Sequence, residues 1–355
     1  MKNQKANSLF HHHSSTAASA KKTSGLVLLT ALLLVGGGIL NAQATKSYAQ
    51  LKAEHPGWIQ APGRLMHPDC VHVVPSGAQI EVGSDSKPSV DVKMNGELFA
   101  HYDPCPEQSI DTRHLGSQGG QSPNPSGYGD GWIEASQWEL SLGSSDNIDL
   151  LQGFWHVPNP PAESGALVYL FNGISPTGAQ WIPQPVVQWG DNGSFGGDYY
   201  SVASWFVGPG NFAVVSTPQA ANPSDYIFGD VQQTGVSGVG GQQTLTYFVD
   251  GYNETSGQPT PLYVTTPAGL HWVWAYAGVL EAYNVTSCSQ FPGSGLNHFS
   301  QTNVAHGYPR VKYLTPEGFY GAQYDYFGSG GPQCHFSVSV SGNGSKSGST
   351  SLLKY

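Results

Sequence analysis

The chain has 355 residues, with 14 Lys and Arg against 24 Asp and Glu, which gives a net charge of −10. Charged residues make up only 11% of it, whereas 46 Gly, 25 Pro, 18 Tyr and 9 Trp are present. This balance argues against a nucleic-acid partner, because binding to the phosphate backbone needs a basic surface. The Gly, Pro and aromatic content is typical of strands joined by turns.

Residues 1–44 have the pattern of a secretion signal. Four lysines and no acidic residue precede or flank the apolar run Gly25–Leu40, which is followed by the small-x-small site Ala42-Gln43-Ala44. We predict export to the extracellular space or the periplasm, a mature chain from Thr45, and no stable membrane association after cleavage. The alternative is an uncleaved anchor, although the run is short for a membrane span. Removing the four lysines takes the net charge from −10 to −14.

Four cysteines, Cys70, Cys105, Cys288 and Cys334, follow the leader. An even number of cysteines in an exported chain predicts disulfides. Three pairings are possible, and the sequence-local one joins Cys70 to Cys105 and Cys288 to Cys334. Zinc is not expected, because neither C-x-x-C nor H-E-x-x-H occurs. We therefore predict no metal and no cofactor.

The chain divides into regions of different composition. Residues 45–65 are polar and predict a short helix or an ordered arm. Together with the following short alternating runs they form an expected N-terminal module or pro-region, residues 45–115. Residues 116–130 are rich in Gly, Ser, Pro and Gln and predict a linker or processing site. Residues 341–355 are predicted to be a flexible tail.

Residues 131–340 contain many short runs of β-forming residues separated by turn signals, and no clear amphipathic helix. Many short strands without a βαβ rhythm predict a two-sheet antiparallel β-sandwich of the jelly-roll or concanavalin type. The expected strands are Val71–Val74 and Ala78–Val82 in the N-terminal module and, in the main domain, Leu167–Phe171, Val186–Trp189, Tyr199–Val207, Phe212–Val215, Leu245–Val249, Leu262–Thr265, His271–Tyr276 and His335–Val340.

Two polar residues stand out inside aromatic strands, Gln184 and Glu281. A carboxylate in an apolar run is costly to bury unless it is protonated, hydrogen-bonded or functional. The alternatives are that Glu281 lies on a solvent face and that Gln184 pairs with backbone at a bulge. In an unbroken strand Glu281 and Trp272 would point to opposite faces, but Gly278 could introduce a bulge that changes this.

Six segments resemble, in the same order, the strands of the eqolisins, a family of acid glutamic peptidases. They lie between Gly131 and Asn303 and comprise Gly153–Pro160, Val168–Gly173, Ile182–Trp189, Tyr200–Phe206, Phe228–Val231 and Ala277–Tyr283. Ile182–Trp189 resembles the I-L-Q-x-G-V-x-[FW] strand, which bears the catalytic glutamine. Ala277–Tyr283 resembles the A-E-W-I-V-E-D-[FP] strand, which bears the catalytic glutamate. The resemblance implies a sandwich with Gln184 and Glu281 as the catalytic pair on a concave face.

Several residues depart from the family pattern. Asn172, Gln188 and Ser204 stand where the family has acidic residues. Pro183 and Pro185 flank Gln184, and because proline donates no ladder hydrogen bond, we expect this strand to be an edge strand or bulged.

The resemblance implies hydrolysis of polypeptide substrates by a secreted endopeptidase with an acidic pH optimum. Glu281 would act as general base on a water, and the Gln184 amide would donate to the oxyanion, a contribution of roughly 3 kcal/mol. Four tryptophans, Trp181, Trp189, Trp205 and Trp272, are expected to line a substrate groove, with sandwich core as the alternative. We expect a monomer. The alternative functions are a non-catalytic carbohydrate- or peptide-binding sandwich and a surface structural protein.

Overall fold

The computed structural model describes residues 46–83, 88–113, 130–140, 146–178, 180–208, 212–293, 296–306, 312–313, 320–323, 334, 337–341 and 349–354. The expected signal peptide and most of the expected linker lie outside these residues. In the described part no helix is long and apolar enough to cross a membrane. The short helices are α1 (Tyr48–Glu54) and the 3-10 turns η1 (Pro68–Cys70), η2 (Gly240–Gln242) and η3 (Cys288–Gln290).

The first sheet has the strand order β21-β8-β18-β10-β11-β12-β13-β3, with β14 paired to β12. Its strands in chain order are β3 (Val71–Val74), β8 (Gly131–Glu139), β10 (Leu167–Pro176), β11 (Ile182–Trp189), β12 (Tyr200–Val207), β13 (Ala213–Ser216), β14 (Gln219–Ala221), β18 (Trp272–Tyr283) and β21 (Tyr320–Gln323).

The second sheet has the order β22-β23-β19-β9-β15-β16-β17-β4-β5-β6, with β20 paired to β19. Its strands are β4 (Ala78–Val82), β5 (Val90–Met94), β6 (Glu97–Tyr102), β9 (Ile148–His156), β15 (Tyr226–Ser237), β16 (Thr244–Asn253), β17 (Leu262–Thr265), β19 (Leu296–His306), β20 (Lys312–Tyr313), β22 (Ser337–Ser341) and β23 (Ser349–Lys354). A small third sheet joins β1 (Ile59–Ala61), β2 (Arg64–Met66) and β7 (Ile110–Asp111).

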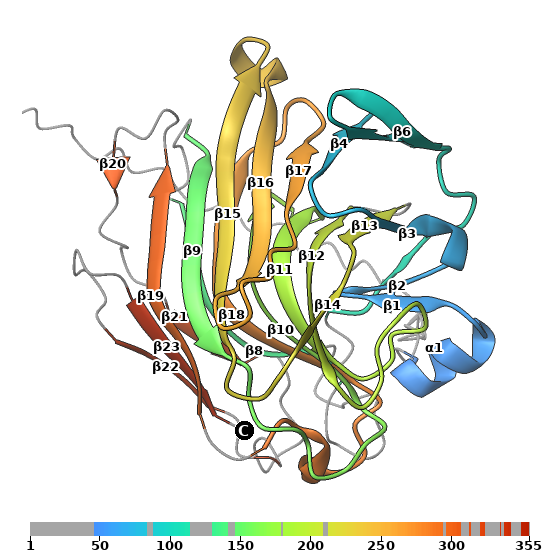
Figure 1. Ribbon diagram of the computed structural model, residues 1–355, viewed down its shortest axis with the longest axis vertical. Coiled ribbons are helices and arrows are strands. Elements are labelled where there is room, and N and C mark those ends of the chain that lie inside the picture. The colour runs from blue at the N-terminus through green and yellow to red at the C-terminus, as the bar shows by residue number, and fades with distance from the viewer. Residues whose placement is uncertain are drawn as a thin grey trace, which may run out of the picture. The chain divides into compact units, whose positions relative to one another are not determined.

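The two large sheets pack face to face, as the expected β-sandwich requires (Figure 1). Apolar side chains of both sheets fill the space between them, for example Ile174 and Phe206 of the first sheet against Val231 and Tyr247 of the second. The strands of the sandwich are antiparallel, except where β3 joins β13 and β4 joins β17 in parallel. These two parallel pairs bring residues from the start of the chain to one edge of each sheet.

We call residues 46–113 the N-terminal segment. Besides β3 and β4, it places α1, β1 and β2 against the outer face of the first sheet. Helix α1 begins with a capping box, in which Ser47 Oγ accepts from the Gln50 N–H and Gln50 Oε1 accepts from the Ser47 N–H. Its Tyr48 and Leu51 are buried against that sheet face.

Strands β10, β11 and β12 are buried at every residue. Alternating burial is the rule where one face of a sheet meets water. Here one face meets the second sheet and the other meets the N-terminal segment. The central part of the first sheet is therefore covered on both sides.

Strand β11 corrects the expectation that Pro183 and Pro185 demand an edge strand, because it lies between β10 and β12. Its pairing with β10 stops at Val186, whereas its pairing with β12 covers Ile182 to Trp189. The two prolines thus lie where β11 is hydrogen-bonded on one side only. Their missing N–H groups cost the ladder little there.

The predicted tail is also corrected in part. Ser349–Lys354 forms β23, which pairs with β19 and β22. A Ser-rich composition does not prevent this, because an antiparallel ladder is made by backbone N–H and C=O groups, which Ser and Thr carry like other residues. Residues 342–348 lie outside the described residues.

The two disulfides join Cys70 to Cys105 and Cys288 to Cys334, the sequence-local pairing. The first closes a loop within the N-terminal segment, and the second ties the end of the β18 region to the last part of the chain. Neither bridge links the N-terminal segment to the sandwich. That segment is held to the sheets by packing and hydrogen bonds.

The close approach of the sheets depends on glycine at two facing positions. A Cβ on Gly229 of β15 would lie 2.6 Å from the Trp155 ring and 3.0 Å from Pro185 Cγ. A Cβ on Gly251 of β16 would lie 2.7 Å from Val202 Cγ1. The second sheet therefore has room for Pro185 and Val202 of the first sheet only because Gly229 and Gly251, respectively, lack a side chain.

We predict that Gly229→Ala lowers the free energy of unfolding by about 1–3 kcal/mol, because the added methyl overpacks the space between the sheets. Gly235→Ala on the same strand is the matched control, since its added Cβ meets Thr246 at an ordinary 3.4 Å. Urea unfolding at neutral pH measures both. Equal midpoints for the two variants would contradict the tight sheet contact.

Candidate active site

Glu281 lies on β18 just beyond a bulge. The register of β18 shifts against both β8 and β10 between Tyr276 and Val279, and Gly278 has φ +126°. The extra residue reverses the alternation of faces. Tyr276 and Glu281, five residues apart, therefore both contact Trp132 on the outer face of the first sheet. The bulge expected at Gly278 is present.

The Glu281 carboxylate is fully buried and receives three hydrogen bonds. The Trp132 indole Nε1–H donates to Oε2 at 2.8 Å. The Tyr283 hydroxyl and the Gly63 backbone N–H both donate to Oε1, each at 2.6 Å. Because the side chain has no exposed surface, the solvent-face alternative for Glu281 does not hold.

Two of the donors belong to the sandwich and one does not. Trp132 and Tyr283 lie on β8 and β18, whereas Gly63 forms the turn between β1 and β2 in the N-terminal segment. Gly63 has φ +76°, a left-handed conformation that glycine adopts without strain. Its N–H enters the site in this conformation, and Thr112 N–H closes the turn by donating to Gly63 O at 2.9 Å.

A polar chain continues from Glu281 into the N-terminal segment. Tyr283 Oη lies 2.8 Å from Thr112 Oγ1, and Gln60 Nε2 donates to the same Thr112 oxygen at 2.9 Å. Tyr169, on β10 next to Glu281, donates its hydroxyl to Gln60 O. The N-terminal segment thus contacts the carboxylate and both neighbouring tyrosines through buried hydrogen bonds.

Burial raises the pKa of Glu281 from 4.5 to about 7. The hydrogen bonds from Tyr283, Gly63 and Trp132 and the charge of Arg113 lower this pKa in part but do not offset the loss of water. The carboxyl group therefore stays protonated in acid while the segment covers it. A carboxyl group with a pKa near neutrality is frequent in active sites, although ion-pair networks also produce such shifts.

An ion-pair cluster lies in the N-terminal segment where this segment covers Glu281, and the segment over Glu281 is called the cover. Arg113 Nη2 donates to Asp111 Oδ2 at 2.5 Å, Arg64 Nη2 lies 3.9 Å from the same oxygen, and the Arg113 guanidinium lies 6.0 Å from the Trp132 ring centre. Burial would raise the pKa of Asp111, but the bonds and charges of Arg113 and Arg64 outweigh it and lower this pKa. The cluster is therefore charged at neutral pH, and it weakens as acid protonates Asp111.

Gln184 lies on the same sheet face but does not contact Glu281. Across the three strands β18, β10 and β11, Glu281 is level with Tyr169 and Gln188. Gln184 lies further along, beside Gly173, which pairs with Tyr276. Two strand spacings across and four residues along the strand separate their Cα atoms by roughly 16 Å. The Gln184 amide is fully buried, and neither of its polar atoms has a partner within the described residues.

Gln188, one of the departures from the family pattern, has a structural role. Its Nε2 donates to the carbonyls of Gly190 and Phe195, and its Oε1 accepts from Asn192 Nδ2. These bonds fix the loop between β11 and β12. The amide of Gln188 is therefore not free to serve Glu281 in this structure.

The four tryptophans expected in a substrate groove are all buried. Trp181, Trp189 and Trp272 pack between the sheets, beside Phe206, Tyr200 and Tyr247 respectively. Trp205 lies on the outer face of the first sheet in the same cluster as Tyr169 and Tyr276, and Phe195 stacks on it. The core alternative describes three of them, and only Trp205 shares a face with Glu281.

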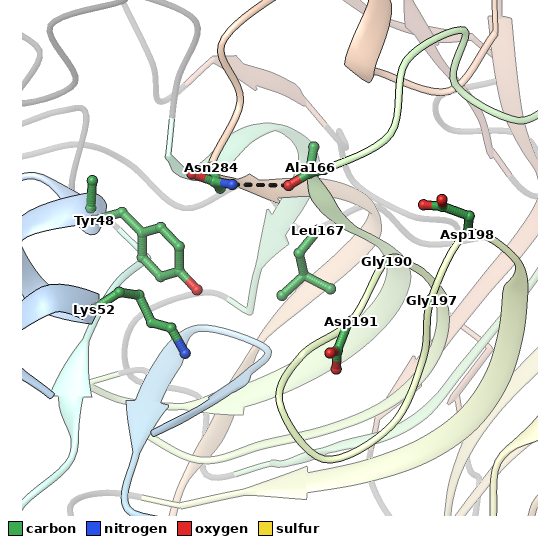
Figure 2. Close-up of a pocket in the computed structure, with 11 residues that line it drawn as sticks. Tyr48, Lys52, Ala166, Leu167, Gly190, Asp191, Gly197, Asp198 and Asn284 are labelled. Atoms are coloured by element: carbon green, nitrogen blue, oxygen red, sulfur yellow. Dashed lines mark hydrogen bonds between the residues drawn. The ribbon is translucent and has the colours of Figure 1, made fainter. Parts of the chain in front are cut away.

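A cavity of about 430 Å³ lies between α1 and the loop that joins β11 to β12 (Figure 2). Tyr48 and Lys52 of α1 line one side, and Leu167, Asp191 and Asp198 line the other. The Tyr48 ring lies 4.8 Å from the Tyr283 ring, so two side chains, Tyr48 and Tyr283, lie between the cavity and Glu281. The N-terminal segment forms part of its wall.

Sequence reasoning did not single out Trp132, Tyr283 or Gly63 as site residues. Tyr283 had a detectable signal, since a residue two positions after Glu281 on a strand points to the same face. Trp132 and Gly63 had none, because they lie 149 and 218 residues away in sequence. No group of three or more potential metal ligands occurs among the described residues.

No family model matches the sequence, and no curated protein matches it. Among solved structures, two complexes of scytalido-glutamic peptidase are similar, one with a transition-state analog inhibitor and one with a peptide-based transition-state analog. They share 16% and 15% identity, with TM-scores of 0.38 and 0.39, over 63% of this chain and 97% and 99% of those chains. SCP-B, a member of the eqolisin family in complex with the tripeptide Ala-Ile-His, has 15% identity and a TM-score of 0.38 over 63% and 99%. The relationship is distant, and at this identity it says nothing about activity.

We predict that the covered protein is more stable in acid than at neutral pH because of Glu281. Its pKa is higher in the folded chain than the ordinary 4.5, so the folded state binds the proton more tightly and loses stability as pH rises from about 4.5 to about 7. The expected contribution is about 3 kcal/mol.

Denaturant unfolding of the wild type and of Glu281→Gln between pH 4 and 8 measures this contribution. The difference between the two proteins should change across this window. Burial also raises the pKa of Asp250, to about 6. Its effect on the free energy of unfolding is the same in both proteins and therefore cancels in their difference. A difference that does not vary with pH would mean that Glu281 is ionised at an ordinary pKa under the segment.

Proposed function

We propose that this chain is the precursor of a secreted acid endopeptidase of the glutamic type, with Glu281 as the general base. The observation that carries the proposal is the complete burial and the hydrogen bonding of Glu281. A carboxyl group with no exposed surface is held by two sandwich side chains and capped by a backbone amide from the N-terminal segment. A purely structural glutamate at this position would be more costly than an apolar residue.

The chemistry requires a water in place of the Gly63 amide. Ionised Glu281 takes a proton from the water, the water oxygen attacks the carbonyl carbon of the peptide bond, and an oxyanion forms. Protonated Glu281 then gives its proton to the amide nitrogen as the carbon–nitrogen bond breaks. The mechanism calls for a polypeptide substrate and water and for no cofactor.

The oxyanion role of Gln184 stays a prediction. In the covered form Gln184 lies beside Gly173 and not beside Glu281. The role would need the strands around Phe171 to shift when the cover leaves. Its buried amide without a hydrogen-bond partner is compatible with a group that binds elsewhere in another state.

Residues 45–115 are proposed as a pro-region, released by a cut within 116–129. The placement of the N-terminal segment supports this idea. Its strands β3 and β4 to β6 lie at the ends of the two large sheets, so their departure leaves the strand order of the sandwich intact. No disulfide of the described residues holds this segment to the sandwich.

The cause of the raised pKa is compatible with activity of the released enzyme in acid. Under the segment the pKa of Glu281 is about 7, so the base is neutral in acid. Water entering the site would lower this pKa, since desolvation is the largest cause of the shift. The uncovered Glu281 would be ionised at a pH where the covered one is not.

We predict that the full chain, incubated at about pH 4, cleaves denatured protein after losing its N-terminal segment, and that Glu281→Gln lowers this hydrolysis by on the order of 10²–10⁴-fold. Glu163→Gln, at an exposed loop position, is the control with the same chemical change. Peptide release and N-terminal sequencing of the products are the measurements. Hydrolysis by Glu281→Gln at the wild-type rate would rule out the proposal.

The separation of Gln184 from Glu281 favours a second candidate, a non-catalytic peptide-binding sandwich. In that case the β1–β2 turn occupies a binding site that another peptide takes when the segment leaves. A protein that binds denatured chains in acid without cleaving them, even after its N-terminal segment is removed, would support this candidate. A carbohydrate-binding role has less support, because the four tryptophans are buried.

A further inference from the structure

Tyr283 is the side-chain hydroxyl that donates to Glu281. Its oxygen lies 2.6 Å from Glu281 Oε1 and 2.8 Å from Thr112 Oγ1. The Tyr283 side chain is fully buried, and the Tyr48 ring packs against it at 4.8 Å. Two of its partners, Thr112 and Tyr48, belong to the N-terminal segment and would leave with it. Glu281 would remain, because both residues lie on β18.

Two donors share one carboxylate oxygen in the covered state. The Gly63 N–H and the Tyr283 O–H both reach Oε1 at 2.6 Å. Donors to one carboxylate oxygen approach along separate lone-pair directions, which puts Gly63 N and Tyr283 Oη roughly 4 Å apart. A water that replaces the Gly63 amide would then lie roughly 4 Å from Tyr283 Oη, which leaves room for one substrate atom between them.

The hydroxyl is a donor over the whole working range of pH. Burial, together with the negative charge of Glu281, raises the pKa of Tyr283 well above its ordinary value. Gln184, by contrast, lies two strands away on the far side of Phe171. Tyr283 is thus the neutral donor next to the place where the attacking water would stand.

We propose that Tyr283 is a catalytic residue that donates a hydrogen bond to the oxyanion formed when the Glu281-activated water attacks the peptide carbonyl. The water oxygen forms the new bond to carbon, its proton goes to Glu281, and the carbonyl oxygen takes the negative charge. The single Tyr283 O–H, which points to Glu281 Oε1 before the attack, turns to this oxygen as Glu281 becomes protonated. When the carbon–nitrogen bond breaks, the proton on Glu281 passes to the leaving nitrogen, and Tyr283 keeps its own proton. This inference rests on the proposed peptidase function.

The test compares full-length Tyr283→Phe, Gln184→Ala, Glu281→Gln and wild type. Each is first treated at pH 4 with immobilised wild-type protein, which is then removed, so that processing does not depend on the variant. We expect Tyr283→Phe to lose about 10²–10³-fold in kcat with KM changed little. The apparent pKa of the acidic limb of the kcat–pH profile should rise in Tyr283→Phe, because the Tyr283 hydrogen bond lowers the pKa of Glu281.

Tyr247→Phe is the matched control for the loss of a buried hydroxyl. Tyr247 is fully buried between the sheets, and its hydroxyl donates to Ile148 O at 2.8 Å. It should lose stability and keep kcat. An equal loss of kcat in both tyrosine variants would overturn the proposal, since it would then reflect stability alone.

The remaining outcomes separate the inference from the proposed function. If Glu281→Gln is inactive while Tyr283→Phe keeps kcat within threefold of wild type, the role of Tyr283 is wrong and the peptidase function stands. If Glu281→Gln keeps full activity, the peptidase site itself is wrong. Should Tyr283→Phe fail to fold, Tyr283→His and Tyr283→Leu replace it. Only histidine carries a donor, so equal kcat in these two variants would also overturn the inference.

Discussion

The burial of one carboxyl group under a backbone turn is the interaction on which the site depends. Glu281 loses all contact with water, and the Gly63 N–H replaces part of its hydration. Three hydrogen bonds and a nearby arginine do not restore what water provided, so its pKa stays near 7. The same contact covers the carboxyl group and keeps it protonated in acid.

Two carboxyl groups, Glu281 and Asp111, change the stability of this contact in opposite directions as pH falls. Protonation of Glu281 favours the covered fold in acid, whereas protonation of Asp111 removes the charge that holds Arg64 and Arg113. The first change begins near neutrality and the second belongs to more acidic conditions, since the pKa of Asp111 is below its ordinary range. The cover is thus favoured in mild acid and weakened in strong acid.

The sandwich itself explains why the N-terminal segment covers so much of the first sheet. Strands β10 to β12 are buried on both faces, and only one face meets the second sheet. The other face needs an apolar partner, which the N-terminal segment supplies with Trp58, Leu65 and Met66. Under the proposed function, release of the segment exposes this face around Glu281.

Much of the fold could be read from the sequence, because strand formation depends on local alternation and turn residues. The strands Val71–Val74, Ala78–Val82 and Leu262–Thr265 were predicted with the bounds that they have. The β-sandwich class followed from many such runs. The place of Pro183 and Pro185 in a central strand was missed, because it depends on where the neighbouring strand β10 stops pairing.

The sequence by itself determined that a glutamate lies inside an apolar strand next to a possible bulge, since composition and the two-residue period are local properties. Only the tertiary structure decided which groups meet that glutamate. Gly63 and Trp132 come from other strands, and the separation of Gln184 from Glu281 depends on the register of β10 against β11 and β18. The raised pKa likewise depends on the loss of water, which comes only from packing against distant residues.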